Sequence, residues 1–246
     1  MSGEHAQHAA HVSHDEAAGT AARPEREAWN ERYSERVRVW SGAPNVELTR
    51  QIADLTPGRA LDLGCGEGAD AVWLARQGWK VTAVDVSDVA LARAAGHAAD
   101  AGLSEAIEFR HGNLLDDFPP GEFDLVSAQF LYPQDDTARA GLLRRAVQAV
   151  GPGGVALVES HSGLPEWERA EQDSDDAGHG HGHGGHGGHG GHAGMKFAKP
   201  AEILASLQLP DGEWDVLVCE EHERVQNGPD GKPTTRIDST LKLRRR

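Results

Sequence analysis

Three glycines alternate with other residues in Gly64-Cys65-Gly66-Glu67-Gly68, directly after the apolar run at residues 60–63. Glycine adopts positive φ without strain and has no side chain to hold a ligand away from the backbone. Where such a turn begins a helix, unpaired backbone N–H groups attract polar ligands. Asp85 ends the next apolar run, where a carboxylate can accept hydrogen bonds from both hydroxyls of a ribose. This pattern predicts a pocket for a nucleoside.

Two classes of cofactor fit a glycine turn of this kind. If Ala69 takes the last place of a GxGxxG/A pattern, the turn would bind a dinucleotide, and the chain would be an NAD-dependent oxidoreductase. The glycines themselves are spaced GxGxG, and Asp62 stands two residues before the first of them. A carboxylate there repels a pyrophosphate but attracts a nucleoside that carries a sulfonium and an ammonium. The charge pattern favours the cationic nucleoside.

Residues 61–68 resemble the first motif of class I methyltransferases that depend on S-adenosylmethionine (SAM), and Val84-Asp85-Val86-Ser87 resembles the second. The resemblance covers about residues 25–160 and continues through Gly112-Asn113-Leu114-Leu115, residues 123–131 and residues 151–154. It implies that Asp62 binds the amino end of SAM, that Asp85 binds the ribose, and that Asn113 holds the adenine where the family usually has Asp. The cofactor-binding residues that it implies are Asp62, Gly64, Cys65, Gly66, Gly68, Asp85, Val86, Asn113, Leu114 and Gln129. The alternative for each motif is a turn or strand of an α/β fold that binds no cofactor.

An aromatic segment precedes the glycine turn. Residues 29–33 and 39–45 resemble the N-terminal region of tellurite-resistance and thiopurine S-methyltransferases, which implies a lid over the cofactor. As a lid, Trp29, Tyr33 and Trp40 would exclude water, and Arg32 would meet an anionic substrate or the donor carboxylate. Aromatic residues at this spacing also occur simply as helix-packing residues, so both interpretations stay open.

His161 follows the last apolar run of the alternating region, at the edge where ligands bind in an open α/β sheet. It is the candidate general base, although a histidine at a strand end can also be hydrogen-bonded and inert. Methyl transfer from a sulfonium depends mainly on alignment and desolvation, so the residues do not identify the acceptor. We expect a small molecule, and the resemblance suggests a thiol or chalcogen compound.

Histidines recur within a Gly-rich tract at His179, His181, His183, His186, His189 and His192. Imidazoles separated by flexible glycines can converge on Ni, Zn or Cu. A catalytic metal is not expected, because such a tract cannot hold precise ligand geometry. Adventitious metal binding and a low-complexity surface segment remain equal alternatives. A second hypothesis for the whole chain is a Ni- or Zn-binding protein on a methyltransferase scaffold.

Short apolar runs alternate with helical patterns along the chain, which is typical of a doubly wound, Rossmann-like α/β sheet. We expect seven strands, mostly parallel with an antiparallel C-terminal strand. The expected strands are residues 60–63, 80–84, 107–110, 123–127, 154–159, 214–220 and 234–243. The expected helices are residues 69–77, 87–101, 135–149 and 200–207.

The composition limits the domain organisation and the partners. Residues 1–23 form an expected disordered, His-containing tail, and residues 24–246 form one methyltransferase domain with a flexible Gly/His-rich insertion at about 163–194. A net charge of −15 disfavours nucleic acid as a partner. Cys65 and Cys219 lack zinc or disulfide spacing, and no apolar stretch is long enough to span a bilayer. We therefore expect a cytoplasmic protein with no membrane partner.

Overall fold

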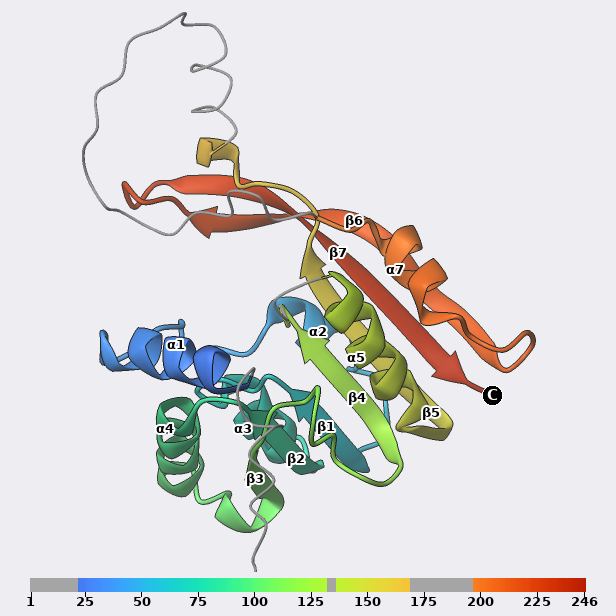
Figure 1. Cartoon of the computed structure of the whole chain (residues 1–246), viewed down its shortest axis with the longest axis horizontal. Helices are drawn as coiled ribbons and strands as arrows, with labels where there is room; N and C mark the ends of the chain where they lie inside the picture. The colour runs from blue at the N-terminus through green and yellow to red at the C-terminus, as the bar shows by residue number, and fades with distance from the viewer. Residues whose placement is uncertain (1–21, 132–135, 169–196) are drawn as a thin grey trace, which may run out of the picture.

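A computed structural model describes residues 22–131, 136–168 and 197–246. Seven strands form one sheet in the order β3-β2-β1-β4-β5-β7-β6 (Figure 1). The neighbours from β3 to β5 are parallel, whereas β7 runs antiparallel to both β5 and β6. The strands are β1 (Arg59–Leu63), β2 (Lys80–Asp85), β3 (Ile107–His111), β4 (Phe123–Gln129), β5 (Val150–His161), β6 (Trp214–Asn227) and β7 (Pro233–Arg245). This sheet confirms the predicted seven-stranded, mostly parallel Rossmann-like architecture.

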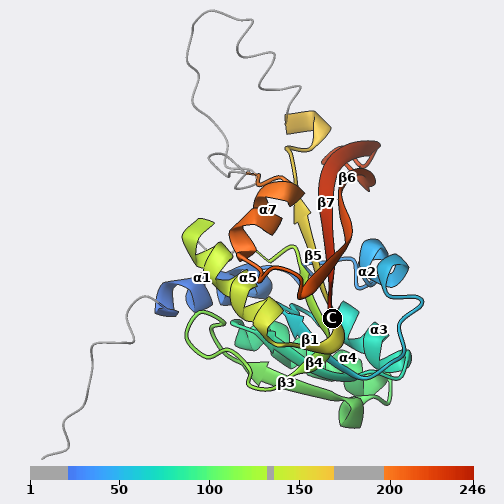
Figure 2. The same ribbon diagram turned by 90° about the vertical axis from the view of Figure 1, so that its right-hand side faces the viewer.

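Helices cover both faces of the sheet. Figure 2 shows α5 and α7 on one side of β5 and β7, with α2 and α3 on the other. The described helices are α1 (Ala22–Ser34), α2 (Val46–Gln51), α3 (Ala69–Arg76), α4 (Asp88–Asp100), the short 3₁₀ turn η1 (Ser104–Ala106), α5 (Asp136–Gln148) and α7 (Pro200–Leu207). None of the helices in these described ranges is long and apolar enough to cross a membrane.

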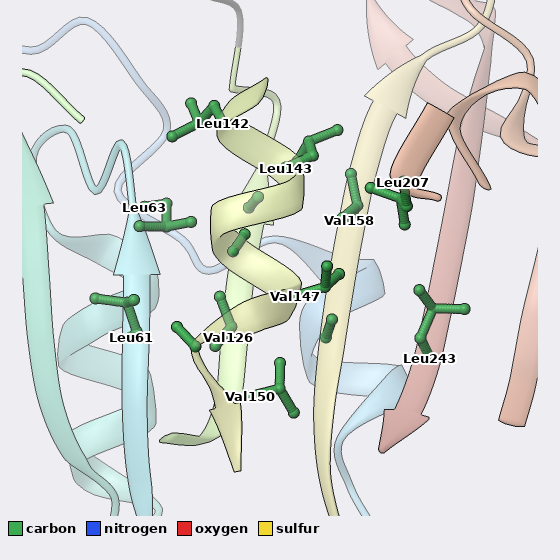
Figure 3. Packing of buried hydrophobic residues seen from close by; sticks show 14 of the residues in the cluster. Leu61, Leu63, Val126, Leu142, Leu143, Val147, Val150, Val158, Leu207 and Leu243 are labelled. Atoms are coloured by element: carbon green, nitrogen blue, oxygen red, sulfur yellow. The ribbon is translucent and has the colours of Figure 1, made fainter. Parts of the chain in front are cut away.

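Alternating strand residues divide the core into two layers. Leu61, Leu63, Val126 and Val158 lie in the cluster that packs against α5 and α7 (Figure 3). Leu125 and Leu157 point to the opposite face, with the residues of α2 and α3. Successive side chains of a strand point to opposite faces, and paired residues on neighbouring strands share a face. The second face therefore also carries Asp62, Ser127 and Gln129 near the carboxyl ends of the strands.

The last two strands extend further than the sequence pattern indicated. β6 and β7 stay paired to Asn227 and Pro233, so the hairpin projects beyond the body of the sheet (Figure 1). Its outer half alternates charged and polar residues, which gave no apolar pattern to recognise as a strand.

Some residues at the predicted ends of the N-terminal tail and the start of the insertion contact the folded domain. The carbonyl of Gly163 accepts a hydrogen bond from Arg236, and Glu166 accepts hydrogen bonds from Thr234 and Thr235. Residues 163–168 therefore pack against β7 rather than begin the insertion, and α1 already starts at residue 22. Residues 1–21 and 169–194, with all six histidines of the Gly-rich tract, lie outside the described residues.

Candidate functional site

The glycine turn joins the end of β1 to the start of α3. Gly64, Gly66 and Gly68 have φ values of +71°, +53° and +80°, which explains why the turn needs glycine at all three positions. The backbone N–H groups of Gly64 and Cys65 donate to the carbonyl of Val84 at 2.8 and 3.0 Å. The turn is therefore fixed to the end of β2, next to Asp85.

Carboxylates surround this turn on one face of the sheet. Asp62 is paired with Ala83, two residues before Asp85, so both aspartates share that face. Asp85 accepts hydrogen bonds from the N–H groups of Gly66 and Ser87, both at 2.8 Å. Burial raises the pKa of Asp62, and the charges of Asp70 and Asp85 raise it further. The site therefore groups buried carboxyl groups, and burial together with their mutual repulsion favours the protonated form of Asp62.

Two buried acceptors at this site have no hydrogen-bond partner among the described residues: Asp62 Oδ2 and Gln129 Oε1. They lie close together, because Asp62 pairs with Ser127 and Gln129 Nε2 donates to the Ser127 hydroxyl at 3.1 Å. A buried polar atom without a partner costs about 1–3 kcal/mol. When Asp62 is ionised both atoms are acceptors, so a donor group that enters the site can satisfy them.

The four predicted lid residues come together beside the glycine turn. The indole N–H of Trp40 donates to the Tyr33 hydroxyl at 2.9 Å, and the Trp29 and Tyr33 rings lie 6.0 Å apart. The Arg32 guanidinium lies 5.5 Å from the ring centres of both Trp29 and Trp40. A methyl group placed on Gly66 would lie 2.9 Å from the Tyr33 hydroxyl oxygen. The aromatic segment therefore covers the turn directly.

Glu67 and Arg93 attach the aromatic segment to the glycine turn, which the sequence did not predict. Glu67 accepts hydrogen bonds from the backbone N–H groups of Val39 and Trp40, at 3.2 and 3.1 Å, and from Arg93 at 2.8 Å. Arg93 also donates to the carbonyls of Tyr33 and Arg36. Burial alone would raise the pKa of Glu67, but these hydrogen bonds hold it below its ordinary value. Nothing in the sequence marks Arg93, because its partners are the Glu67 side chain, 26 residues away, and two backbone carbonyls 57 and 60 residues away.

Asn45 ties down the far end of the same segment. Its backbone N–H and its side-chain amide both donate to Asp70, each at 2.7 Å. Near the other end, the Asn30 side-chain oxygen accepts from the Ser87 hydroxyl at 2.7 Å. The segment from residue 29 to residue 45, which we call the lid, is thus attached to α3, α4 and the glycine turn.

Three side chains occupy the space against the glycines. A methyl group on Gly64 would lie 2.7 Å from Leu131, and one on Gly66 would contact Tyr33 and Trp40. A ligand that presses against this backbone must therefore displace these side chains.

The remaining predicted cofactor residues lie around the same turn in less distinctive settings. The Asn113 side-chain oxygen accepts from the Leu115 N–H at 2.9 Å, so it caps its own turn. Leu114 is buried in the core, and the Val86 carbonyl contacts His111. Cys65 is partly buried and packs against the core, and burial raises the pKa of its thiol.

His161 lies at the end of β5 on the same face as Asp62 and Gln129. Glu159 pairs with Gln129, and His161 stands two residues further along β5. Its Nδ1 lies 2.8 Å from Oδ1 of Asp238, a fully buried residue of β7. Burial lowers the pKa of His161 to about 4, which keeps the imidazole neutral at pH 7. Sequence reasoning missed Asp238, since it lies 77 residues away.

Phe130 and Leu131 lie between His161 and the glycine turn. The Phe130 ring lies 4.6 Å from the imidazole of His161, and Leu131 lies against Gly64. Phe130 has a φ of +53°, a costly conformation for a bulky residue. His161 is therefore separated from the turn by two consecutive side chains.

No metal centre is found in the part of the chain that the structure describes. Within these ranges, no three His, Cys, Asp or Glu side chains are grouped to hold an ion, and Cys65 and Cys219 are both free thiols.

Comparisons with known proteins identify the central region. A family model described as a methyltransferase domain matches residues 60–154. Over 113 residues, the chain is 33% identical to ribosomal RNA small subunit methyltransferase C of Alcanivorax borkumensis, covering 44% of the chain and 34% of that protein. It is 35% identical over 113 residues to a ubiquinone biosynthesis O-methyltransferase of Azorhizobium caulinodans, covering 45% of the chain and 43% of that protein. The chain thus spans less than half the length of these curated relatives.

The fold is shared with a solved structure over nearly the whole chain. Magnesium protoporphyrin IX methyltransferase from Synechocystis, solved with bound SAH, superposes with a TM-score of 0.62 at 15% identity. The superposition covers 92% of this chain and 99% of that one. The matches confirm the resemblance inferred from the glycine turn and Asp85.

Proposed function

Because residues 60–154 form a class I methyltransferase domain, we propose that the protein is a SAM-dependent methyltransferase acting on a small-molecule acceptor. The observation that carries this proposal is a pair of buried acceptors beside the glycine turn, Asp62 Oδ2 and Gln129 Oε1, which have no hydrogen-bond partner among the described residues. SAM presents an ammonium at one end and a sulfonium near it, and both are favoured by a pocket of negative charge.

The residues present fit SAM. Asp62 and Gln129 would accept hydrogen bonds from its ammonium. Each Asp85 oxygen already accepts one backbone N–H and keeps a further lone pair for a ribose hydroxyl. When bound, SAM supplies an electrophilic methyl group on sulfur. Trp29, Tyr33 and Trp40 of the lid would exclude water from it, with Arg32 able to meet the donor carboxylate.

Calorimetry with SAM, its demethylated product and NADH tests this cofactor assignment. We expect SAM and the product to bind and NADH not to bind, because the carboxylates around the turn repel a pyrophosphate. Tight binding of NADH without binding of SAM would overturn the proposal and favour the oxidoreductase.

The relatives, the net charge and the resemblance of the lid bear on the class of methyl acceptor. The curated relatives include a ribosomal RNA methyltransferase and an O-methyltransferase of ubiquinone biosynthesis. The net charge of −15 argues against RNA, whose phosphates would be repelled. The resemblance of the lid suggested a thiol or chalcogen compound. A screen of thiols, selenite, tellurite, small phenols and RNA with radiolabelled SAM identifies the acceptor, and labelling of RNA alone would exclude the small-molecule assignment.

A further inference from the structure

The carboxyl group of Glu159 lies beside the proposed SAM site. Glu159 of β5 is directly opposite Gln129 of β4. Paired residues on neighbouring strands share a face, so both side chains lie on the face that carries Asp62. Glu159 is 1% exposed, so water screens its charge only weakly. A buried carboxyl group is therefore adjacent to Gln129, one of the two residues assigned to the SAM ammonium.

The C-terminal hairpin holds both oxygens of Glu159. Oε1 lies 2.8 Å from Nε2 of His222 on β6, and Oε2 accepts from the hydroxyl of Thr240 on β7 at 2.7 Å. An ionised carboxylate accepts from the N–H of His222, and a protonated one donates to the same nitrogen of a neutral ring. The contact is therefore kept in both states. The His222 side chain is 23% exposed, so it connects the buried carboxyl group with solvent.

The surrounding charges place the titration of Glu159 near neutral pH. Burial raises the pKa of Glu159 to about 7. The hydrogen bond from Thr240 and the charge of His222 oppose this shift, whereas the charge of Asp238 adds to it. From α2, Glu47 faces the same imidazole, because the charge of His222 lowers the pKa of Glu47.

The cations of α2, β6 and β7 on this side of the sheet have other partners. Arg50 pairs with Glu47, Lys242 donates to the Gln51 carbonyl, and Arg224 donates to Asp238. The combined charge of Glu159 and His222 therefore changes by one unit when the pair gains or loses a proton, whichever of the two groups holds it.

We propose that Glu159 and His222 form a proton-linked pair that controls SAM binding. When the pair has lost its proton, its negative charge strengthens binding of the SAM cation, and when it has gained one, binding weakens. The sulfonium and ammonium of SAM are two positive charges against one carboxylate, so a buried negative charge one strand away attracts the molecule. This inference rests on the proposed methyltransferase function and adds a regulation of the same site. The proton exchanges with solvent through the partly exposed His222.

Calorimetry with SAM between pH 6 and pH 8 tests the proposal. Affinity in the wild type should rise with pH, and the rise in Glu159→Gln should be smaller by about 10-fold, because a charge at this separation acts through the weakly screened interior. Burial also raises the pKa of Asp62, but Asp62 titrates in both proteins, so the difference between them isolates Glu159. An equal loss of affinity at every pH would indicate a structural role and overturn the proposal.

Proton release provides a second measurement. Calorimetry at pH 7 in buffers of different ionisation enthalpy counts the protons that leave the protein when SAM binds. A pair that is half protonated at this pH should release about 0.4 proton more in the wild type than in Glu159→Gln. Equal release in the two proteins would contradict the proton-linked pair.

His222→Gln tests the pair without changing the carboxyl group. The charge of the imidazole favours ionised Glu159, so its removal should move the rise in SAM affinity to higher pH by about one unit. An unchanged pH profile would show that His222 is not part of the pair.

Glu220→Gln is the matched control. Glu220 lies opposite Thr240 on β6, and its side chain is 56% exposed, so this variant should follow the wild type at every pH. Absence of SAM binding by the wild type at every pH would sink the methyltransferase function. SAM binding with the same pH dependence in wild type and Glu159→Gln would sink only the role of Glu159 and His222.

Discussion

At the residue scale, the buried carboxyl group of Asp62 lowers the stability of the folded protein. Its side chain is almost completely buried, one of its oxygens has no described partner, and burial raises its pKa. Such a residue costs folding free energy in the protein alone. Protonation lowers this cost, and so would a cation lying against the carboxylate, as in the proposed SAM site.

Replacing Asp62 with Asn should weaken SAM binding by about 10- to 100-fold, since hydrogen bonds to charged groups contribute about 1.5–3 kcal/mol. The free energy of unfolding without SAM should stay the same or rise, because a buried charge is removed. Calorimetry and urea unfolding measure the two quantities. Asp124→Asn is the control, because Asp124 accepts from Arg59 N–H at the opposite end of the sheet. A variant that binds SAM normally would show that Asp62 is not part of the site.

Glu159 makes stability depend on pH. Burial raises its pKa from 4.5 to about 7 in the folded protein. A raised pKa in an acid means that its contribution is fully present below the unfolded value and is lost as the pH rises through 7. Relative to Glu159→Gln, the wild type should lose about 2 kcal/mol of unfolding free energy between pH 5 and pH 8.

Urea unfolding of both proteins at the two pH values tests this prediction. Glu220→Gln, an exposed neighbour on β6, should follow the wild type. If wild type and Glu159→Gln keep a constant difference across this range, the assigned pKa shift is wrong.

At the scale of elements, polar contacts attach the lid to the glycine turn, α3 and α4, and the buried ring of Tyr33 adds an apolar contact. Glu67, Arg93 and Asp70 hold backbone groups of the lid, while Val37 and Trp40 remain largely exposed. Segments with few buried apolar contacts open at lower free energy than the core. The same contacts that close the lid over the glycine turn can therefore release it when a ligand enters.

Arg93→Met should loosen the lid without unfolding the domain. It removes the donor to Glu67 and to the carbonyls of Tyr33 and Arg36, while it keeps most of the side-chain volume. Amide hydrogen exchange should accelerate by about 10-fold or more at residues 33–43, with β1 and β4 unchanged. Arg76→Met, at the end of α3, should leave both unchanged. Uniform acceleration in the variant would mean that Arg93 supports the whole fold.

At the scale of the whole molecule, SAM binding by the methyltransferase domain and metal binding by the histidine tract can be tested separately. The domain match ends at residue 154, and the described chain resumes at residue 197 with α7 and the β6–β7 hairpin completing the sheet. Because residues 163–168 pack against β7, a deletion must begin after them to leave the domain intact.

Deleting residues 169–194 should retain SAM binding and abolish most Ni or Zn binding. The reason is that the six histidines of the tract are removed, while no metal-binding group exists among the described residues. Calorimetry with SAM and with each metal measures both effects, and wild type with the six histidines changed to Asn is the matched control. Absence of SAM binding already in the wild type, with metal binding lost in both variants, would support a metal-binding protein on a methyltransferase scaffold.

The sequence alone determined the order of strands and helices, because apolar runs, helical periodicity and glycine spacing are local features of the chain. It also predicted that the glycine turn follows β1 next to Asp62 and Asp85, and the structure places both side chains beside the turn, while their role in binding a nucleoside stays a prediction. The full length of β6 and β7 was missed, because their outer pairing joins polar residues without an apolar pattern.

Only the tertiary structure revealed the contacts between distant residues. The Glu67–Arg93 fastening and the His161–Asp238 contact join residues 26 and 77 positions apart, and neither pair has a local signature. Burial also shifts the protonation of these groups, since desolvation raises the pKa of Asp62 and lowers that of His161. Charge in a folded site depends on which groups the sheet brings together, and that is fixed by packing in three dimensions.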